Sequence, residues 1–291
     1  MEGPGLDERR AALSSLRRLI FSPSVPWERQ RARFAAATSG TPARGVRRDH
    51  FDYGNVRGET LSPPDAVPDR AILYVHGGGY CIGSPAMGRA LGSWLAVTLR
   101  AVVYSLDYRL APEHPAPAAP EDVTALLAHL VGREVVGLGD SAGACALVAA
   151  LLAGAAPVAA LALVSPWLDL ARTYDDDLAA RDPLLSPGWL EACALAYAPT
   201  DLGALVSPLR ASWAGLAPTL VVGASDDLLA PDAGDLAARG DPGLRVATWP
   251  GLWHDFALAV DQLPEAREAA EMIARHVVAV TGWRRNDATG C

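Results

Sequence analysis

The chain has 291 residues, 51% of them hydrophobic, and 25 basic residues against 33 acidic ones give a net charge of −8. These values are typical of a folded globular protein with one or two domains. All 25 basic residues are arginine, which excludes mechanisms that need a lysine amine, such as Schiff-base formation or a P-loop. The acidic balance argues against nucleic acid as a partner, because nucleic-acid binders concentrate basic charge.

The cysteines and the N-terminal residues favour a cytoplasmic protein. The cysteines are widely separated, with no C-x-x-C pair and no metal-ligand spacing: Cys81, Cys145, Cys193 and Cys291. We therefore expect free thiols and no metal site. The first residues are charged rather than apolar, and no apolar run reaches about 18 residues, so neither a signal peptide nor a membrane span is expected.

Two amphipathic helices are predicted before residue 40. Leucine and isoleucine recur at helical spacing between Leu6 and Phe21, and Pro23 ends the pattern. A second helix is predicted from Trp27 to Thr38. The arginines of the first helix are expected to form a solvated face. We assign residues 1–45 to an N-terminal helical cap and residues 46–291 to the main domain.

After Gly45 the sequence alternates between short apolar runs and longer segments rich in alanine and leucine. The apolar runs are predicted strands: Ala71–Val75, Ala101–Leu106, Glu134–Leu138, Val158–Val164, Thr219–Val222 and Leu244–Trp249. Near-continuous apolar strands that alternate with helices predict an α/β fold with a parallel sheet covered on both faces. The segment from about residue 170 to residue 200 interrupts the alternation and is expected to be a second part of the cap.

A candidate nucleophile lies in the pentapeptide from Gly139 to Gly143, which has the form G-x-S-x-G with Ser141 at its centre. An apolar strand precedes it and a helix-forming run, Ala144–Ala153, follows it. This strand, turn and helix are the context of the nucleophile elbow, in which flanking glycines permit a strained turn that exposes the serine oxygen. An ordinary turn is the alternative reading.

A second glycine-rich segment, from His76 to Gly79, follows the strand Ala71–Val75. Three consecutive glycines allow backbone N–H groups to converge on one oxygen, as a tetrahedral oxyanion requires. The alternative is a flexible turn without a role.

The elbow serine needs a base downstream, and only His254 and His276 follow it. His276 lies in the predicted helix Glu265–Val280, where we expect a surface residue. His254 lies in a loop just after the last predicted strand, where α/β sheets place functional groups, and is the predicted base.

The acid that orients this base should lie between Ser141 and His254 in the chain. The strand Thr219–Val222 is followed by two candidates, Asp226 and Asp227. We predict Asp226, because the turn should aim the earlier residue at His254 and direct the later one outward.

Together these segments and several others resemble the hormone-sensitive-lipase-like branch of the α/β-hydrolases, as found in bacterial carboxylesterases. The resemblance extends from about Ala71 to Phe256 and includes these further segments: Tyr108–Ala119, Ser165–Leu170, Ser207–Leu209 and Asp226-x-Leu228. Three places depart from the family pattern. Ala144 and Cys145 stand where many relatives have Gly-Asn or a similar pair. Asp255 stands where glycine usually follows the histidine, and Tyr80 stands where phenylalanine or tryptophan is usual.

The resemblance implies an α/β-hydrolase fold with a mostly parallel, eight-stranded sheet and a small helical cap. It implies oxyanion-hole donors at Gly78, Gly79 and Ala142, and carboxylic esters of short to medium acyl length as substrates. No cofactor is needed. The aromatic residues expected at the substrate pocket are Tyr80, Trp167 and Trp253.

The predicted function is therefore ester hydrolysis through an acyl-enzyme on Ser141, with a possible homodimer as the assembly. A biosynthetic deacetylase, or another specialised acyl hydrolase or transferase, would use the same residues on an unusual substrate. A lyase on this scaffold would show turnover without net hydrolysis. A ligand-binding receptor of the same fold is disfavoured, because His254 is present.

Overall fold

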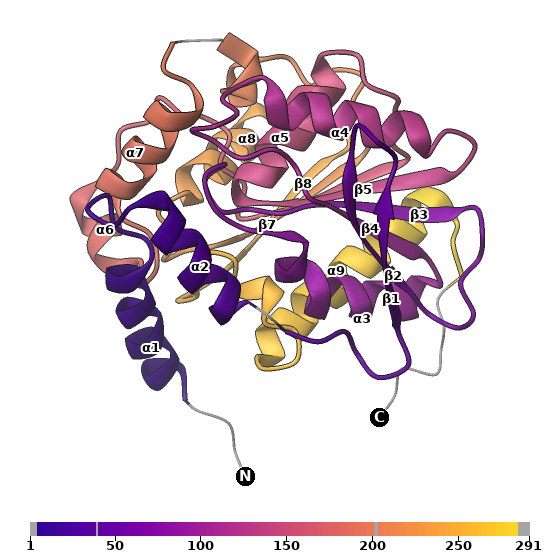
Figure 1. The fold of residues 1–291 in the computed structure, drawn as a ribbon, viewed down its shortest axis with the longest axis horizontal. Coiled ribbons are helices and arrows are strands. Elements are labelled where there is room, and N and C mark those ends of the chain that lie inside the picture. The colour runs from indigo at the N-terminus through magenta and orange to yellow at the C-terminus, as the bar shows by residue number, and fades with distance from the viewer. Residues whose placement is uncertain (1–4, 39, 201–202, 285–291) are drawn as a thin grey trace.

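The computed structural model describes residues 5–38, 40–200 and 203–284, which form a mixed eight-stranded sheet with helices on both faces (Figure 1). The strand order is β1-β2-β4-β3-β5-β6-β7-β8. The strands are β1 (Arg47–Asp52), β2 (Arg57–Ser62), β3 (Arg70–Val75), β4 (Val102–Leu106), β5 (Glu134–Asp140), β6 (Ala160–Val164), β7 (Thr219–Ala224) and β8 (Leu244–Trp249). The predicted α/β-hydrolase fold is confirmed.

The six strands from β4 to β8 in this order include every strand that the sequence pattern predicted, and they pair in parallel. Strands β3 to β7 are buried along nearly their whole length, and all residues of β6 and β7 are buried, whereas β8 forms the other edge of the sheet and is only partly buried. Helices on both faces explain why these strands are apolar runs instead of alternating ones. Strands β1 and β2 pair antiparallel at one edge.

The helices form two layers around the sheet (Figure 1). Their bounds are α1 (Leu6–Leu19), α2 (Trp27–Ala37), α3 (Arg89–Leu99), α4 (Ala118–His129), α5 (Ser141–Leu152), α6 (Asp176–Arg181), α7 (Pro187–Tyr197), α8 (Ala230–Arg239) and α9 (Pro264–Thr281). α3 and α9 cover one face, and α4, α5 and α8 cover the other. None of the helices in the described ranges is long and apolar enough to cross a membrane.

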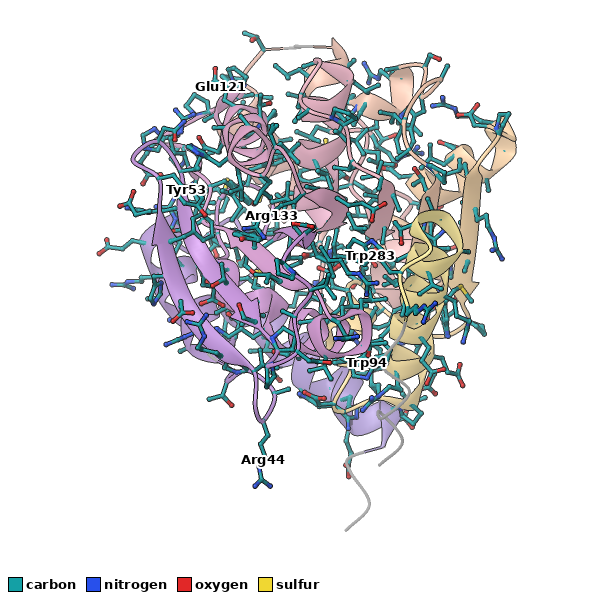
Figure 2. All side chains as sticks on the ribbon, turned by 90° about the vertical axis from the view of Figure 1, so that its right-hand side faces the viewer. Arg44, Tyr53, Trp94, Glu121, Arg133 and Trp283 are labelled. Atoms are coloured by element: carbon teal, nitrogen blue, oxygen red, sulfur yellow. The ribbon has the colours of Figure 1, made fainter. Side chains whose placement is uncertain are left out.

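The face under α9 is closed by tryptophans at its margins, both labelled in Figure 2. Trp94 lies on α3 and has the guanidinium of Arg267 5.5 Å from its ring, while Trp283 follows α9 and has that of Arg70 at 5.3 Å. Each aromatic ring therefore buries apolar surface and also attracts a cation at the edge of the core.

The N-terminal helices α1 and α2 pack against α6 and α7, the helices between β6 and β7, at the left of Figure 1. Phe21, which follows α1, makes edge contacts with Phe34 of α2 at 5.4 Å and with Trp189 of α7 at 4.9 Å between ring centroids. Aromatic pairs prefer this edge-to-face geometry. Segments about 160 residues apart in sequence thus share one apolar cluster.

The arginines of α1 do not form the purely solvated face that the charge pattern suggested. Arg10 donates to the carbonyl oxygens of Gly251 and Arg181, and Arg17 donates to those of Ala179 and Asp182. The helix therefore uses its arginines to bind carbonyl groups of two other segments. Charge spacing alone could not show this, because the acceptors are backbone atoms remote in sequence.

We expect Gln30→Ala to lower the free energy of unfolding by about 1–3 kcal/mol, because it leaves buried polar groups without partners. The Gln30 side chain is buried, donates to the carbonyl oxygens of Ser22 and Val25, and accepts a hydrogen bond of 2.8 Å from Trp189 Nε1. Chemical unfolding followed by tryptophan fluorescence measures the change. Arg29→Ala, an exposed neighbour on the same helix, is the control, and equal losses in the two variants would contradict the prediction.

Candidate active site

The functional residues predicted from sequence come together at the carboxyl end of the parallel strands. The glycine segment follows β3, Ser141 follows β5, the aspartate pair follows β7 and His254 follows β8. Parallel strands present their carboxyl ends at the same edge, so loops remote in sequence meet there.

Ser141 occupies the sharp turn between β5 and α5. Its φ is +50°, a left-handed conformation that is uncommon for a residue with a side chain. Gly143 makes the turn possible, because a Cβ atom at this position would lie 2.1 Å from the carbonyl oxygen of Val75. The predicted strand, turn and helix are therefore present, and close packing of α5 against the end of β3 requires glycine.

The glycine segment after β3 is tied to this turn by Asp140, the residue before Ser141. The buried Asp140 carboxylate accepts hydrogen bonds from the Gly77 N–H at 2.8 Å and from the Tyr74 hydroxyl at 2.6 Å. The pKa of Asp140 is raised by burial and by the carboxylate of Asp255. One side chain thus fixes the glycine segment relative to Ser141.

The backbone groups predicted as oxyanion donors have N–H groups available. Gly78 and Gly79 have φ values of +102° and +60°, and in the described ranges neither N–H donates to a protein acceptor. Ala142 lies in the first turn of α5, where N–H groups lack an acceptor within the helix. Such donors, together with the positive end of the helix dipole, suit a negatively charged oxygen.

His254 is buried, and its hydrogen-bond partner is Asp227. Nδ1 of His254 lies 3.1 Å from both carboxylate oxygens of Asp227. Oδ1 of Asp227 also accepts from the N–H of Leu229 at 2.8 Å, which fixes the carboxylate in the turn. This is the arrangement of an acid that selects the tautomer of a histidine.

The prediction of Asp226 is therefore wrong. Its carboxylate faces α1, where Oδ2 lies 3.2 Å from Arg10 Nη1. The chain after β7 remains hydrogen-bonded to the chain after β8, through Ser225 N–H to Trp249 and Asp226 N–H to Leu252. Asp226 lies in the turn after β7, and these hydrogen bonds fix that turn so that Asp227 faces His254 and Asp226 faces α1.

A second carboxylate lies at the other ring nitrogen of His254. Oδ2 of Asp255 is 3.2 Å from Nε2. Burial lowers the pKa of His254, but Asp227 and Asp255 outweigh burial and raise it well above its ordinary value of 6.5. In the described part of the chain, no hydrogen bond joins Ser141 and His254. The sequence marked Asp255 as a departure from the family pattern but did not predict that it lies at Nε2 of His254.

A cavity of about 420 Å³ opens on these residues. Its lining is mostly apolar and comes from α1, α2, the α6–α7 connection and η4 (Phe256–Leu258). Ser141, His254, Asp255, Gly78 and Trp253 contribute to it. A mostly apolar cavity with a few convergent polar groups is typical of a small-molecule site.

Of the three aromatic residues expected at the pocket, the structure brings only Trp253 to this cavity. Tyr80 is buried behind it and stacks on Tyr197 with 3.6 Å between ring centroids. The Trp167 ring is also buried, and its backbone N–H donates to the carbonyl oxygen of Ser141 at 3.1 Å. The prediction of Tyr80 and Trp167 as cavity walls is not supported, because both side chains pack into the core beneath the site.

His276 was placed wrongly in the sequence analysis, and Asp182 was missed there. His276 was expected at the surface, but it is buried and its Nε2 lies 3.1 Å from the carbonyl oxygen of Pro218. Asp182 was not identified: it is buried between α6 and α7, and its Oδ2 accepts from the N–H of Leu228, next to Asp227. No sequence motif indicated this contact, since it joins segments 46 residues apart.

The cysteines within the described ranges, Cys81, Cys145 and Cys193, are free and buried, whereas Cys291 lies outside those ranges. Burial raises the pKa of the Cys145 thiol to about 12, which makes it a poor nucleophile. A search of the described residues finds no group of three or more side chains suited to hold a metal ion.

Comparisons with known proteins agree with this geometry. Residues 72–258 match a family model described as the alpha/beta hydrolase fold. An acetyl-hydrolase of Streptomyces hygroscopicus is 37% identical over 235 residues, which cover 75% of this chain and 79% of the relative. The esterase LipU of Mycobacterium tuberculosis is 31% identical over 289 residues, which cover 90% and 96%.

Solved structures show the same relationship. The crystal structure of an esterase from the bacterial hormone-sensitive lipase family has 30% sequence identity and a TM-score of 0.84, covering 97% of this chain and 99% of that one. A hormone-sensitive lipase from a metagenome library has 30% identity and a TM-score of 0.86, covering 96% and 99%. The chain therefore belongs to the alpha/beta hydrolase family, as a serine esterase of the bacterial hormone-sensitive-lipase type.

Proposed function

We propose that the chain hydrolyses carboxylic esters of short to medium acyl length through an acyl-enzyme on Ser141, with His254 as base and Asp227 as acid. The observation that carries the proposal is the contact of His254 Nδ1 with both Asp227 oxygens at 3.1 Å, in a cavity that Ser141 also lines. A histidine held in one tautomer can take a proton from serine with its other nitrogen.

In this mechanism the Ser141 oxygen attacks the ester carbonyl carbon while His254 Nε2 takes the hydroxyl proton. The resulting oxyanion accepts hydrogen bonds from the N–H groups of Gly78, Gly79 and Ala142. His254 then protonates the departing alcohol, and a water molecule releases the acyl group by the same steps in reverse. Hydrogen bonds of a catalytic site often form fully only with substrate bound, so the free site need not join Ser141 to His254.

The N-terminal helices and the segment at about residues 170–200 are proposed to act together as the cap. Leu13, Leu16 and Phe21 reach the cavity from the first, and Leu184 and Trp189 reach it from the second. Arg10 also joins the cap to the loops that carry Asp227 and His254, through Asp226 and the carbonyl oxygen of Gly251. The cap should therefore limit the size of the substrate, whereas folding of the rest of the chain should depend little on the cap.

A dedicated deacetylase is the second candidate function. It is supported by the relative from Streptomyces hygroscopicus that carries the name acetyl-hydrolase. Such an enzyme would remove an acetyl group from an oxygen or nitrogen of a particular substrate with the same residues. Its activity on simple p-nitrophenyl esters would be low, which distinguishes it from a general esterase. A cytoplasmic location and a homodimer remain predictions.

We expect Ser141→Ala to abolish hydrolysis of p-nitrophenyl acetate and butyrate while the protein stays folded. The substitution removes the nucleophilic atom but little packing, because alanine keeps the Cβ atom at this turn. Steady-state assays measure activity, and circular dichroism confirms folding. Covalent labelling by a fluorophosphonate should occur in the wild type and disappear in the variant. Unchanged turnover in folded Ser141→Ala would refute the mechanism.

We expect Asp227→Asn to lower kcat by about three to four orders of magnitude, because an amide neither fixes the histidine tautomer nor balances the imidazolium charge. The amide oxygen can still accept from the Leu229 N–H, so the turn should survive. Asp226→Asn is the matched control and should lower kcat by no more than about tenfold, since its ion pair with Arg10 is partly exposed. Comparable losses in the two variants would argue against Asp227 as the acid.

The acyl preference should lie at about two to six carbons, because the cavity of about 420 Å³ must hold both the acyl and the alcohol group and lies near the lower end of the usual range for ligand sites. A series of p-nitrophenyl esters from acetate to laurate measures kcat/KM for each chain length. If kcat/KM kept rising to twelve carbons, the cap could not be closed over the site as proposed.

A further inference from the structure

His254 lies between two carboxylates, one at each ring nitrogen. Asp227 is 3.1 Å from Nδ1, which is the contact that the mechanism uses. Asp255 is 3.2 Å from Nε2, the nitrogen that must accept the proton of Ser141. The mechanism gives this second contact no role.

The position of Asp255 is fixed by its backbone. Its φ of +56° places it in the left-handed region, and its N–H donates to Ser165 Oγ at 3.0 Å. The side chain is 13% exposed and lines the cavity. Within the described residues, Oδ1 is buried without a hydrogen-bond partner. The turn therefore helps to hold the carboxylate at His254, and Asp140 is a further neighbour of this carboxylate.

We propose that Asp255 is a positioning residue that binds His254 Nε2 in the free enzyme, stabilises the imidazolium and thereby moves the active range of the enzyme to higher pH. The inference rests on the proposed roles of Ser141 and His254. It gives Asp255 no direct contact with the substrate. Asp255 acts through the histidine, which must release this carboxylate before it can serve Ser141.

Carboxyl groups from several segments surround His254, and the nearest arginine contacts in these loops are those of Arg10 with Asp226 and Gly251. Four carboxyl groups act on it electrostatically, and they come from four separate segments: Asp140 at the end of β5, Asp182 between α6 and α7, Asp227 after β7, and Asp255. No ion pair joins any of these four carboxyl groups to an arginine of the described chain. These carboxyl groups therefore stabilise the positively charged form of His254.

The direction of the effect follows from which form of the histidine is active. A base must be neutral to take the serine proton, and a carboxylate 3.2 Å from Nε2 favours the charged form. The raised pKa of His254 means that activity falls as the pH drops through that higher pKa. Removing the charge of Asp255 should lower this pKa, so the acid limb of the pH profile should move to lower pH.

Two substitutions remove the charge and suit the backbone. Asn and Gly are the residues that best tolerate the left-handed conformation at this position. Asp255→Asn keeps the shape of the side chain, and Asp255→Gly removes it, while the N–H that binds Ser165 remains in both. Asp261→Asn is the matched control, because Asp261 is an acidic residue that lines the same cavity but forms no ion pair with His254.

The test compares kcat/KM for p-nitrophenyl acetate over a range of pH in the full-length wild type and these three variants. We expect the acid-limb midpoint to fall by about one pH unit or more in Asp255→Asn and Asp255→Gly. Well below the wild-type midpoint, activity relative to each plateau should rise by about tenfold. Asp261→Asn should keep the wild-type midpoint.

The rate at which a fluorophosphonate labels Ser141 gives a second readout, since it also needs neutral His254. Midpoints that stay within about 0.2 units of the wild type in both Asp255 variants, or that move as far in Asp261→Asn, would overturn the role of Asp255. If the wild type neither hydrolyses esters nor reacts with the label, the proposed function itself fails. An active wild type with an unmoved midpoint leaves that function intact and removes only this inference.

Discussion

The carboxylate of Asp140 joins the two strand ends on which the site is built. It lies between Tyr74 of β3, the N–H of Gly77 and the turn at Ser141, and it is fully buried. A buried carboxylate is costly unless its oxygens accept hydrogen bonds, and here the available donors belong to the glycine segment and the neighbouring strand. The glycine segment cannot move away without leaving this group unsatisfied. The relative position of the proposed nucleophile and the proposed oxyanion donors follows from that constraint.

Acidic residues dominate the surroundings of His254, in a chain that contains no lysine. Asp227 and Asp255 face its two nitrogens, and burial together with Asp227 raises the pKa of Asp182 to about 6. Burial alone would keep the imidazole neutral, but two carboxylates at 3.1 and 3.2 Å reverse that tendency. The same proximity that lets Asp227 support a developing imidazolium also stabilises that cation before the reaction. The carboxylates therefore make His254 a stronger base, but they also lower the fraction of His254 that is neutral and able to accept a proton at neutral pH.

The helices that cover the site are coupled to the loops beneath them. Arg10 of α1 binds both the carboxylate of Asp226 and the carbonyl oxygen of Gly251, so one side chain contacts the two loops that carry Asp227 and His254. Asp182 provides a second link from the α6–α7 segment, through the N–H of Leu228. These contacts explain how residues outside the catalytic group can influence its geometry. They also explain why Asp226, which neighbours the proposed acid, binds Arg10 of α1 instead.

The sequence by itself determined the elements whose signals are local. Ser141 and the glycines after His76 lie in short motifs between apolar runs, and His254 follows an apolar strand, so chain order and strand ends located all three. The strands β1 and β2 gave no such signal, because their segments are polar and lie at the edge of the sheet. Only the tertiary structure decided between Asp226 and Asp227, and only it buried Tyr80 and Trp167 beneath the site. The physical reason is that the direction of a side chain after a strand depends on how its turn is hydrogen-bonded to the neighbouring segment. The walls of a cavity depend in the same way on packing between segments remote in sequence.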